Sequence, residues 1–175
     1  MSTVAKDDHF SLFGLPARFA LDVEALTQQW RDVAARVHPD RFATASAPER
    51  RVAMQWSARA NEAFRVLRDP MSRARYMCEC AGVDLQTETN TAMSPAFLGQ
   101  QMMWREMLDD ARDASDADAF NALSEELAAA RTGLHDQLVD LIDNQRDYVR
   151  AGELVREWMF VEKMAQSLDH ARPVS

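Results

Sequence analysis

The sequence predicts an all-α protein that consists of a helical hairpin followed by a three-helix bundle. Apolar residues recur at steps of three and four along most of the 175 residues, which is the spacing of amphipathic helices. No stretch shows the apolar–polar alternation of a strand. Gly14, Gly82 and Gly152 lie at or near expected helix ends or turns, and good helix formers such as Ala, Leu, Glu and Arg dominate. A chain of this length can hold one or two small domains with real cores.

The first helix of the hairpin begins at Asp22, whose side chain can cap the helix start. Its apolar positions follow helical spacing: Val23, Leu26, Trp30, Val33 and Val37. The helix ends at His38-Pro39-Asp40, because proline forces the residue before it out of the α region. These three residues therefore form a short polar loop at the tip of the hairpin, where a partner can reach them. A plain helix–turn–helix corner is the alternative interpretation of the tripeptide.

The second helix begins at Ser46, which precedes Glu49 with the spacing of a capping box and has Pro48 in its first turn. Its apolar stripe predicts the buried face: Val52, Trp56, Ala60, Ala63, Phe64 and Leu67. A shorter helix follows over 70–81, and Gly82 can end it.

Residues 82–94 are predicted to link a domain over 1–81 to a bundle over 95–171, because residues 86–91 are polar and rich in Thr. Three helical patterns lie near 95–113, 117–144 and 147–170, with Ser94-Pro95 at the start of the first. Short turns at 114–116 and 144–146 make neighbouring helices antiparallel, as in a three-helix bundle. The apolar spacing predicts its core: Phe97, Trp104, Leu108, Ala111, Phe120, Leu123, Leu127, Ala130, Leu134, Leu138, Leu141, Ala151, Leu154, Val155, Trp158, Val161 and Leu168.

Some apolar residues of the bundle are left over after this core is assigned. Leu98 and Met102 fall at a four-residue step beside the core stripe of the first bundle helix; Glu106 and Asp110 continue the row, and Met103 and Met107 flank it. On the last helix, Phe160 lies in an otherwise polar stripe. Such a surplus indicates a partner-binding surface. The alternative is that single exposed hydrophobic residues are ordinary.

Charge is distributed unevenly along the chain. Residues 1–81 carry a net charge of +2 and residues 82–175 a net charge of −10. The acidic second half argues against nucleic acid as a partner, because phosphates would be repelled. In the first half, Arg31, Arg36 and Arg41 cluster around the helix end and the loop.

The sequence offers no candidate for catalysis or metal binding. Cys78 and Cys80 are two residues apart and point about 200° away from each other on a helix, so they cannot jointly face one metal ion. The four histidines are scattered, and no nucleophile–base pair or phosphate-binding glycine loop occurs. The N-terminal residues lack the apolar run of a signal peptide, and no stretch approaches the roughly 18 apolar residues of a membrane span. We therefore expect a cytoplasmic, non-enzymatic protein without a cofactor and without a membrane partner.

Three segments carry a resemblance to a known family: the opening His9–Pro16, the central His38-Pro39-Asp40-Arg41-Phe42 and the closing Arg65–Pro70. Residues 9–81 resemble a J-domain in these segments. The opening Phe-x-Leu-Phe-Gly-Leu-Pro, the chain length and Ala96-Phe97-Leu98 in a helical second half resemble one branch of that group. This branch is the HscB family, the co-chaperones of iron–sulfur cluster assembly.

The resemblance implies an L-shaped monomer with two partners. The J-domain would dock an ATP-loaded DnaK-class chaperone, HscA, and stimulate its ATP hydrolysis through His38, Pro39, Asp40, Arg31, Arg36 and Arg41. The bundle would bind the iron–sulfur scaffold IscU through Leu98, Met102, Met103, Glu106, Asp110 and Phe160. One alternative is a general J-domain protein that delivers unfolded clients to such a chaperone. A purely structural all-α protein, in which the loop has no role, is another.

Overall fold

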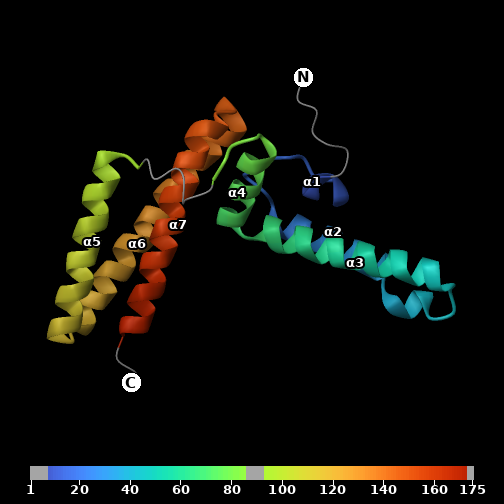
Figure 1. The fold of residues 1–175 in the computed structure, drawn as a ribbon, viewed down its shortest axis with the longest axis horizontal. Coiled ribbons are helices and arrows are strands. Elements are labelled where there is room, and N and C mark those ends of the chain that lie inside the picture. Colours follow the sequence, from blue (N-terminus) through green and yellow to red (C-terminus); the bar gives the residue numbers. More distant parts are fainter. Residues whose placement is uncertain (1–7, 86–92, 173–175) are drawn as a thin grey trace. The chain divides into compact units, whose positions relative to one another are not determined.

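The computed structural model describes residues 8–85 and 93–172, and every regular element in these ranges is a helix (Figure 1). The first elements are α1 (His9–Leu12), α2 (Val23–Arg36), the 3-10 helix η1 (Pro39–Phe42), α3 (Ala47–Arg68) and α4 (Pro70–Cys80). The later ones are α5 (Pro95–Ala114), α6 (Ala117–Leu138), the π-helical η2 (Val139–Gln145) and α7 (Tyr148–Ala171).

The chain separates into two compact units, Met1–Tyr76 and Met77–Ser175. The division falls within α4, a few residues before the expected end of the first domain at residue 81. Residues 86–92 of the expected linker lie outside the described residues. The domain boundaries at 81 and 95 therefore stay a prediction.

Side-chain caps confirm the predicted helix starts. The Asp22 carboxylate accepts hydrogen bonds from two N–H groups of the first turn of α2, at 2.9 and 3.1 Å. Ser46 and Glu49 form the capping box of α3, and the Ser94 hydroxyl caps α5. Gly82 has a φ of 85° just past α4, a left-handed conformation that glycine adopts without a steric penalty.

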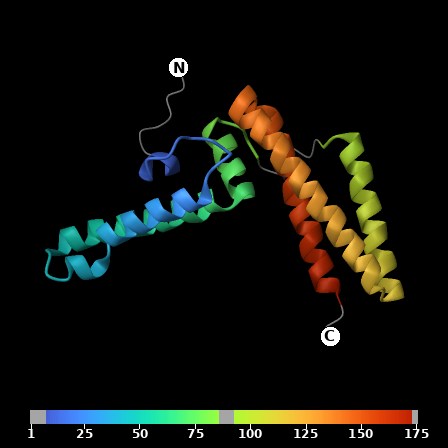
Figure 2. The same cartoon turned by 180° about the vertical axis from the view of Figure 1, so that it is seen from behind.

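Helices α2 and α3 run side by side as a hairpin, which both views of the ribbon show (Figure 1, Figure 2). The buried seam of α3 consists of Ala53, Ala60, Ala63 and Leu67, each at most 4% exposed. Three of these four are alanines, whose small side chains allow two helices to approach closely. Near the C-terminal end of α3, Phe64 stacks on the Trp30 ring of α2 with 4.6 Å between the ring centroids.

The predicted burial of Val52 and Trp56 is wrong. These side chains are 52% and 41% exposed. A two-helix hairpin has one seam, and Ala53 occupies that seam at the distal end of α3 instead of Val52. Besides α2, only the short η1 packs against this end of α3 among the described residues (Figure 1). The apolar stripe is therefore wider than the surface that can be buried.

The base of the N-terminal unit is held by polar contacts of α4. The buried Arg73 guanidinium donates to the Leu67 carbonyl at 2.6 Å and lies 5.1 Å from the centroid of the Phe19 ring. The His9 N–H donates to the Tyr76 hydroxyl at 2.9 Å, and the two rings stack with centroids 4.2 Å apart. Burial lowers the pKa of His9 below its ordinary value of 6.5, so the ring is held neutral at physiological pH.

The C-terminal unit is a three-helix bundle of α5, α6 and α7, as predicted. Nearly all predicted core positions are buried; Phe97, Ala130 and Leu154 are only partly covered. A bidentate ion pair joins α6 to α7, because Arg131 donates to both carboxylate oxygens of Glu162 at 2.7 and 2.8 Å. The Trp158 indole N–H donates to the same carboxylate at 3.0 Å.

The helix expected over 117–144 changes character near its end. It is α-helical to Leu138 and continues as the π-helix η2, which ends at Gln145. The Asp140 carboxylate accepts hydrogen bonds from the side-chain amides of Asn144 and Gln145, which are four and five residues ahead. These side-chain bonds stabilise the wider turn. Periodicity alone does not distinguish a π-turn from an α-turn over so short a stretch.

Replacement of Gly152 by alanine should destabilise the bundle. A Cβ at this position of α7 would lie 2.8 Å from Val83 Cγ1, closer than carbon atoms pack. We expect a loss of about 1–3 kcal/mol in the free energy of unfolding, the usual cost of overpacking. Gly133→Ala on α6 is the matched control, because a Cβ there meets nothing within 4 Å. That change should stabilise by about 0.5–1 kcal/mol through helix propensity. Urea denaturation measures both, and equal shifts would contradict the steric argument.

Candidate partner-binding sites

Asp40 presents its carboxylate to solvent at the tip of the α2–α3 hairpin. His38 caps η1, because its Nδ1 accepts a hydrogen bond from the Asp40 N–H at 3.3 Å. An Nδ1 that accepts this bond has no proton to donate to the Asp40 carboxylate, which lies 3.6 Å away. The carboxylate is 91% exposed. The loop therefore holds a carboxylate available to a cation on another molecule.

The three predicted arginines lie close to this loop in the chain. Arg31 and Arg36 fall in the last two turns of α2 and Arg41 in η1, and all three are exposed. The Arg41 guanidinium donates to the Ala35 carbonyl at 3.3 Å, which ties the loop to the end of α2. None of the three is ion-paired with a carboxylate of the described residues. Their charges remain available to an acidic partner.

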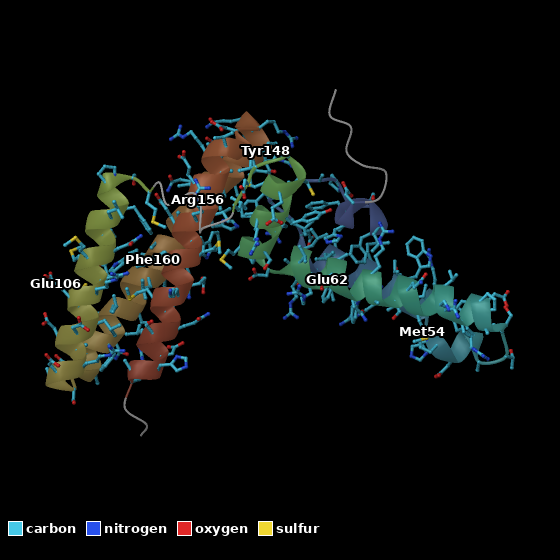
Figure 3. The ribbon with its side chains drawn as sticks, in the orientation of Figure 1. Met54, Glu62, Glu106, Tyr148, Arg156 and Phe160 are labelled. Atoms are coloured by element: carbon cyan, nitrogen blue, oxygen red, sulfur yellow. The ribbon has the colours of Figure 1, made fainter. Side chains whose placement is uncertain are left out.

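The second predicted site is a surface of α5 that combines apolar and acidic residues. Leu98, Met102 and Met103 are 47%, 70% and 48% exposed, respectively. Glu106 and Asp110 are also exposed and continue the same face at four-residue steps; Figure 3 labels Glu106 on this helix. We call these five residues the α5 surface. Methionine side chains adapt to differently shaped partners, which suits a binding face.

Phe160 of α7 lies beside the start of α5. Its ring meets the Phe97 ring edge to face, with 5.9 Å between the centroids. The guanidinium carbon of Arg105 lies 5.6 Å from the Phe160 centroid, within the range of a cation–π contact. Phe160 is therefore half-buried, and part of its ring is covered by an arginine that the sequence analysis did not single out. The sequence did offer a signal for this contact, because Arg105 is a positive residue in the acidic second half of the chain.

Sequence reasoning also missed an apolar groove next to the loop. Val37, Phe42, Pro48, Val52 and Trp56 line this groove, whose volume is about 310 Å³. Val52 and Trp56 were assigned to the core, so their contribution to the surface was overlooked. A short helical hairpin that carries apolar residues on two faces of one helix was the signal that could have revealed it.

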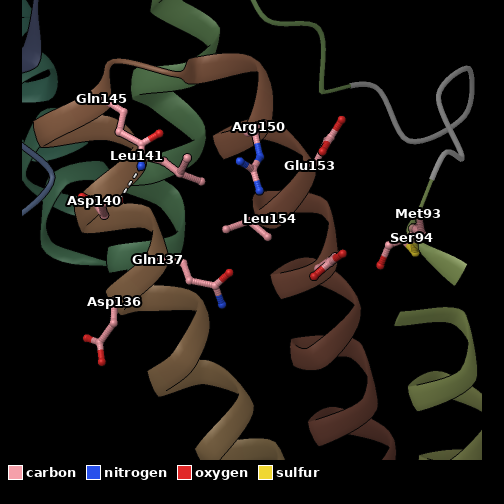
Figure 4. A pocket seen from close by; sticks show the side chains of 11 residues that line it. Met93, Ser94, Asp136, Gln137, Asp140, Leu141, Gln145, Arg150, Glu153 and Leu154 are labelled. Atoms are coloured by element: carbon pink, nitrogen blue, oxygen red, sulfur yellow. Dashed lines mark hydrogen bonds between the residues drawn. The ribbon is translucent and has the colours of Figure 1, made fainter. Parts of the chain in front are cut away.

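A cavity of about 800 Å³ in the C-terminal unit is lined by the end of α6, η2, the first turns of α7 and the start of α5 (Figure 4). Asp136, Asp140, Glu153 and Glu157 line it together with Arg150. Burial raises the pKa of Glu157 above its ordinary value, and a hydrogen bond with Ser94 acts in the opposite direction. The cavity is acidic, and none of the residues predicted to bind a partner lines it.

Relatives of this chain are co-chaperones. Residues 93–169 match a family model described as the HSCB C-terminal oligomerisation domain. A protein named Co-chaperone protein HscB homolog from Bordetella parapertussis is 70% identical over 171 residues, which are 98% of this chain and 99% of the relative. The chain belongs to the HscB family of co-chaperones. A relative of the same name from Burkholderia multivorans is 50% identical over 93% of this chain and 93% of its own length.

Solved structures of HscB proteins have the same fold. Chaperone HscB from Vibrio cholerae superposes with a TM-score of 0.80 at 32% identity, over 94% of this chain and 96% of its own. Human co-chaperone protein HscB superposes with a TM-score of 0.87 over 95% of this chain and 82% of its own; at 23% identity, that likeness concerns the fold alone. The all-α class and the family resemblance are thereby confirmed.

The two cysteines of this HscB-family chain have opposite environments. Cys78 is buried and Cys80 is exposed. Burial, with a smaller contribution from the charge of Glu79, raises the pKa of the Cys78 thiol from 9.0 to about 12. Within residues 8–85 and 93–172, no three His, Cys, Asp or Glu side chains converge as a metal site. None of the helices described is long and apolar enough to cross a membrane.

The two thiols should therefore react with alkylating agents at very different rates. At pH 8 we expect iodoacetamide to modify Cys80 quickly and Cys78 only after unfolding in guanidinium, because the thiolate is the reactive species. Cys80→Ser should abolish labelling of the native protein, as read by mass spectrometry. Rapid labelling of that variant would contradict the burial of Cys78. The raised pKa also means that the folded state loses stability as the pH rises from about 9 towards 12, because the unfolded thiol ionises first.

Proposed function

We propose that this co-chaperone acts in iron–sulfur cluster assembly by bringing a cluster scaffold of the IscU type to a DnaK-class chaperone of the HscA type. The loop and its arginines would bind the chaperone and stimulate its ATP hydrolysis. The α5 surface and Phe160 would bind the scaffold. The observation that carries this proposal is that the two compact units each present an exposed, partner-accessible site of different chemistry.

The loop geometry supports contact with a basic group of the chaperone. Pro39 fixes the backbone, His38 caps η1, and together they present the Asp40 carboxylate to solvent. An exposed carboxylate can form a charge-assisted hydrogen bond with an arginine of a partner at little desolvation cost before binding. The surrounding Arg31, Arg36 and Arg41 would orient an acidic surface of the same partner.

The α5 surface has the composition of a protein interface. Leu98 and Met102 provide apolar anchors, and Phe160 provides an aromatic ring close to the start of the same helix. Glu106 and Asp110 would form a polar rim farther along α5. Interface energy is usually concentrated in a few such anchors and surrounded by weaker polar contacts.

Binding of both partners by one chain would raise their effective concentration near each other. Such linkage increases the encounter rate without any new contact between scaffold and chaperone. Stimulation of the ATPase by the loop would then be timed to the arrival of the scaffold.

A general J-domain protein that delivers unfolded clients is the second candidate. The exposure of Met102 and Met103 favours it, since flexible methionine surfaces bind varied partners. Fluorescence titrations with a labelled folded scaffold and with a labelled unfolded polypeptide distinguish the two. Saturable binding of the scaffold that the unfolded polypeptide does not displace supports the first function.

Asp40→Asn should abolish stimulation of the chaperone ATPase and leave the fold intact. The side chain is almost fully exposed, so we expect the free energy of unfolding to change by less than about 0.5 kcal/mol. The amide keeps the shape but loses the charge that would meet a basic partner group. Steady-state ATPase assays with and without scaffold measure the effect, and scaffold binding should persist. Near-normal stimulation by the variant would refute the role of Asp40, and His38→Gln tests the cap of η1 in the same assay.

Truncation of the apolar anchors should weaken scaffold binding. We expect Leu98→Ala, Met102→Ala and Phe160→Ala together to cost about 2–4 kcal/mol, as hot-spot residues do. The Leu98/Met102 double variant should melt near the parent temperature. Phe160→Ala should lower the melting temperature, because the ring packs against Phe97. Calorimetric titration measures affinity and thermal melts measure stability.

Val149→Ala is the matched control for these variants. Val149 is 67% exposed on α7 and lies outside the proposed interface. Its truncation should change neither scaffold affinity nor melting temperature. Unchanged affinity of the Leu98/Met102 double variant would show that the α5 surface does not bind the scaffold.

A further inference from the structure

A groove between α5 and α7 carries positive charge in the otherwise acidic C-terminal unit. Its volume is about 270 Å³, and its polar lining residues are Arg105, Asp109, Arg112, Lys163 and Ser167. Phe160 forms part of the same groove. We call it the basic groove. It directly adjoins the aromatic ring that we propose as a scaffold anchor.

The concentration of charge in the basic groove does not follow from the composition. Residues 82–175 contain eight Lys and Arg against 18 Asp and Glu, yet three of the eight line this groove beside a single carboxylate. Arg112 and Asp109 form a long, exposed ion pair at 3.8 Å, which is worth little in solvent. Arg105 and Lys163 are not paired with a carboxylate of the described residues.

Arg105 covers one face of the Phe160 ring. Its guanidinium lies over the ring at 5.6 Å from the centroid, so a partner that packs against this face must move it aside. Loss of a cation–π contact opposes such binding. A carboxylate on the partner would offset the loss, because it can pair with Arg105 after displacement and with Lys163 on the other side of the groove. A partner whose apolar side chain has no carboxylate next to it would bind less well.

We propose that the basic groove binds an aspartate or glutamate side chain of the protein that docks on the α5 surface, next to the apolar group that contacts Phe160. The identity of that protein as the scaffold rests on the proposed function. The groove then selects a partner segment in which a carboxylate and an apolar side chain are neighbours. The α5 surface supplies affinity, and Arg105 and Lys163 supply selectivity.

Calorimetric titration of the scaffold at low and high salt tests the proposal. We expect Arg105→Gln and Lys163→Gln each to weaken binding about three- to fivefold at low salt and to reduce its salt dependence, since exposed charge pairs contribute on this scale and are screened by ions. Arg150→Gln, on the same helix as Lys163 but in the acidic cavity, should change nothing. Unchanged or tighter binding by Arg105→Gln would overturn the proposal, because it would mean that this arginine only obstructs Phe160.

A second measurement tests the basic groove without any scaffold. It therefore distinguishes an error in the assignment of the groove from an error in the proposed function. The probe is 3-phenylpropionate, which joins an aromatic ring to a carboxylate, and its neutral analogue 3-phenylpropionamide is the control. We expect the acid to shift the NMR signals of Phe160, Arg105 and Lys163 in a saturable way, and the amide to shift them much less. Lys163→Gln should remove the difference. Equal shifts by both probes, or none, would overturn the assignment even if the scaffold binds.

Discussion

The small number of helices in each unit limits which side chains can be buried. A hairpin has one seam, and a three-helix bundle leaves an outer face on every helix. In α3 the seam is filled by Ala53, Ala60 and Ala63, so Val52 and Trp56 remain at the surface. In α5 the core takes Trp104 and Leu108, so Leu98 and Met102 remain exposed. Both units therefore leave apolar side chains exposed because they contain too few helices to bury them. These exposed apolar side chains can form binding surfaces.

The two proposed sites depend on different features of the fold. The loop site depends on backbone geometry: Pro39 and the His38 cap hold one carboxylate in solvent at the hairpin tip. The α5 surface depends on apolar area that no neighbouring helix covers. A polar contact of the first kind favours orientation and timing, whereas apolar anchors favour affinity. The relatives of this chain are named co-chaperones.

The contacts of Phe160 show how charge can adjust an apolar anchor. The ring is held by Phe97 on one side and is covered by Arg105 on another. This arrangement shields an aromatic ring from water while the protein is free. It also makes access depend on the charge of the partner. The basic groove thereby adds a requirement that hydrophobicity alone would not impose, in a unit whose net charge is otherwise strongly negative.

The sequence by itself determined the features that depend on neighbouring residues along the chain. Asp22, Ser46 and Ser94 cap their helices within one turn, and Gly82 ends α4, so helix limits were predictable. Only the tertiary structure decided which side of each apolar stripe is buried, because that depends on where the next helix lies. Val52 was placed in the core for this reason, and the contact of Arg105 with Phe160 escaped notice, since it joins residues 55 positions apart. Apolar periodicity also did not reveal the π-helical turn of η2, in which the side chains of Asn144 and Gln145 donate hydrogen bonds to Asp140.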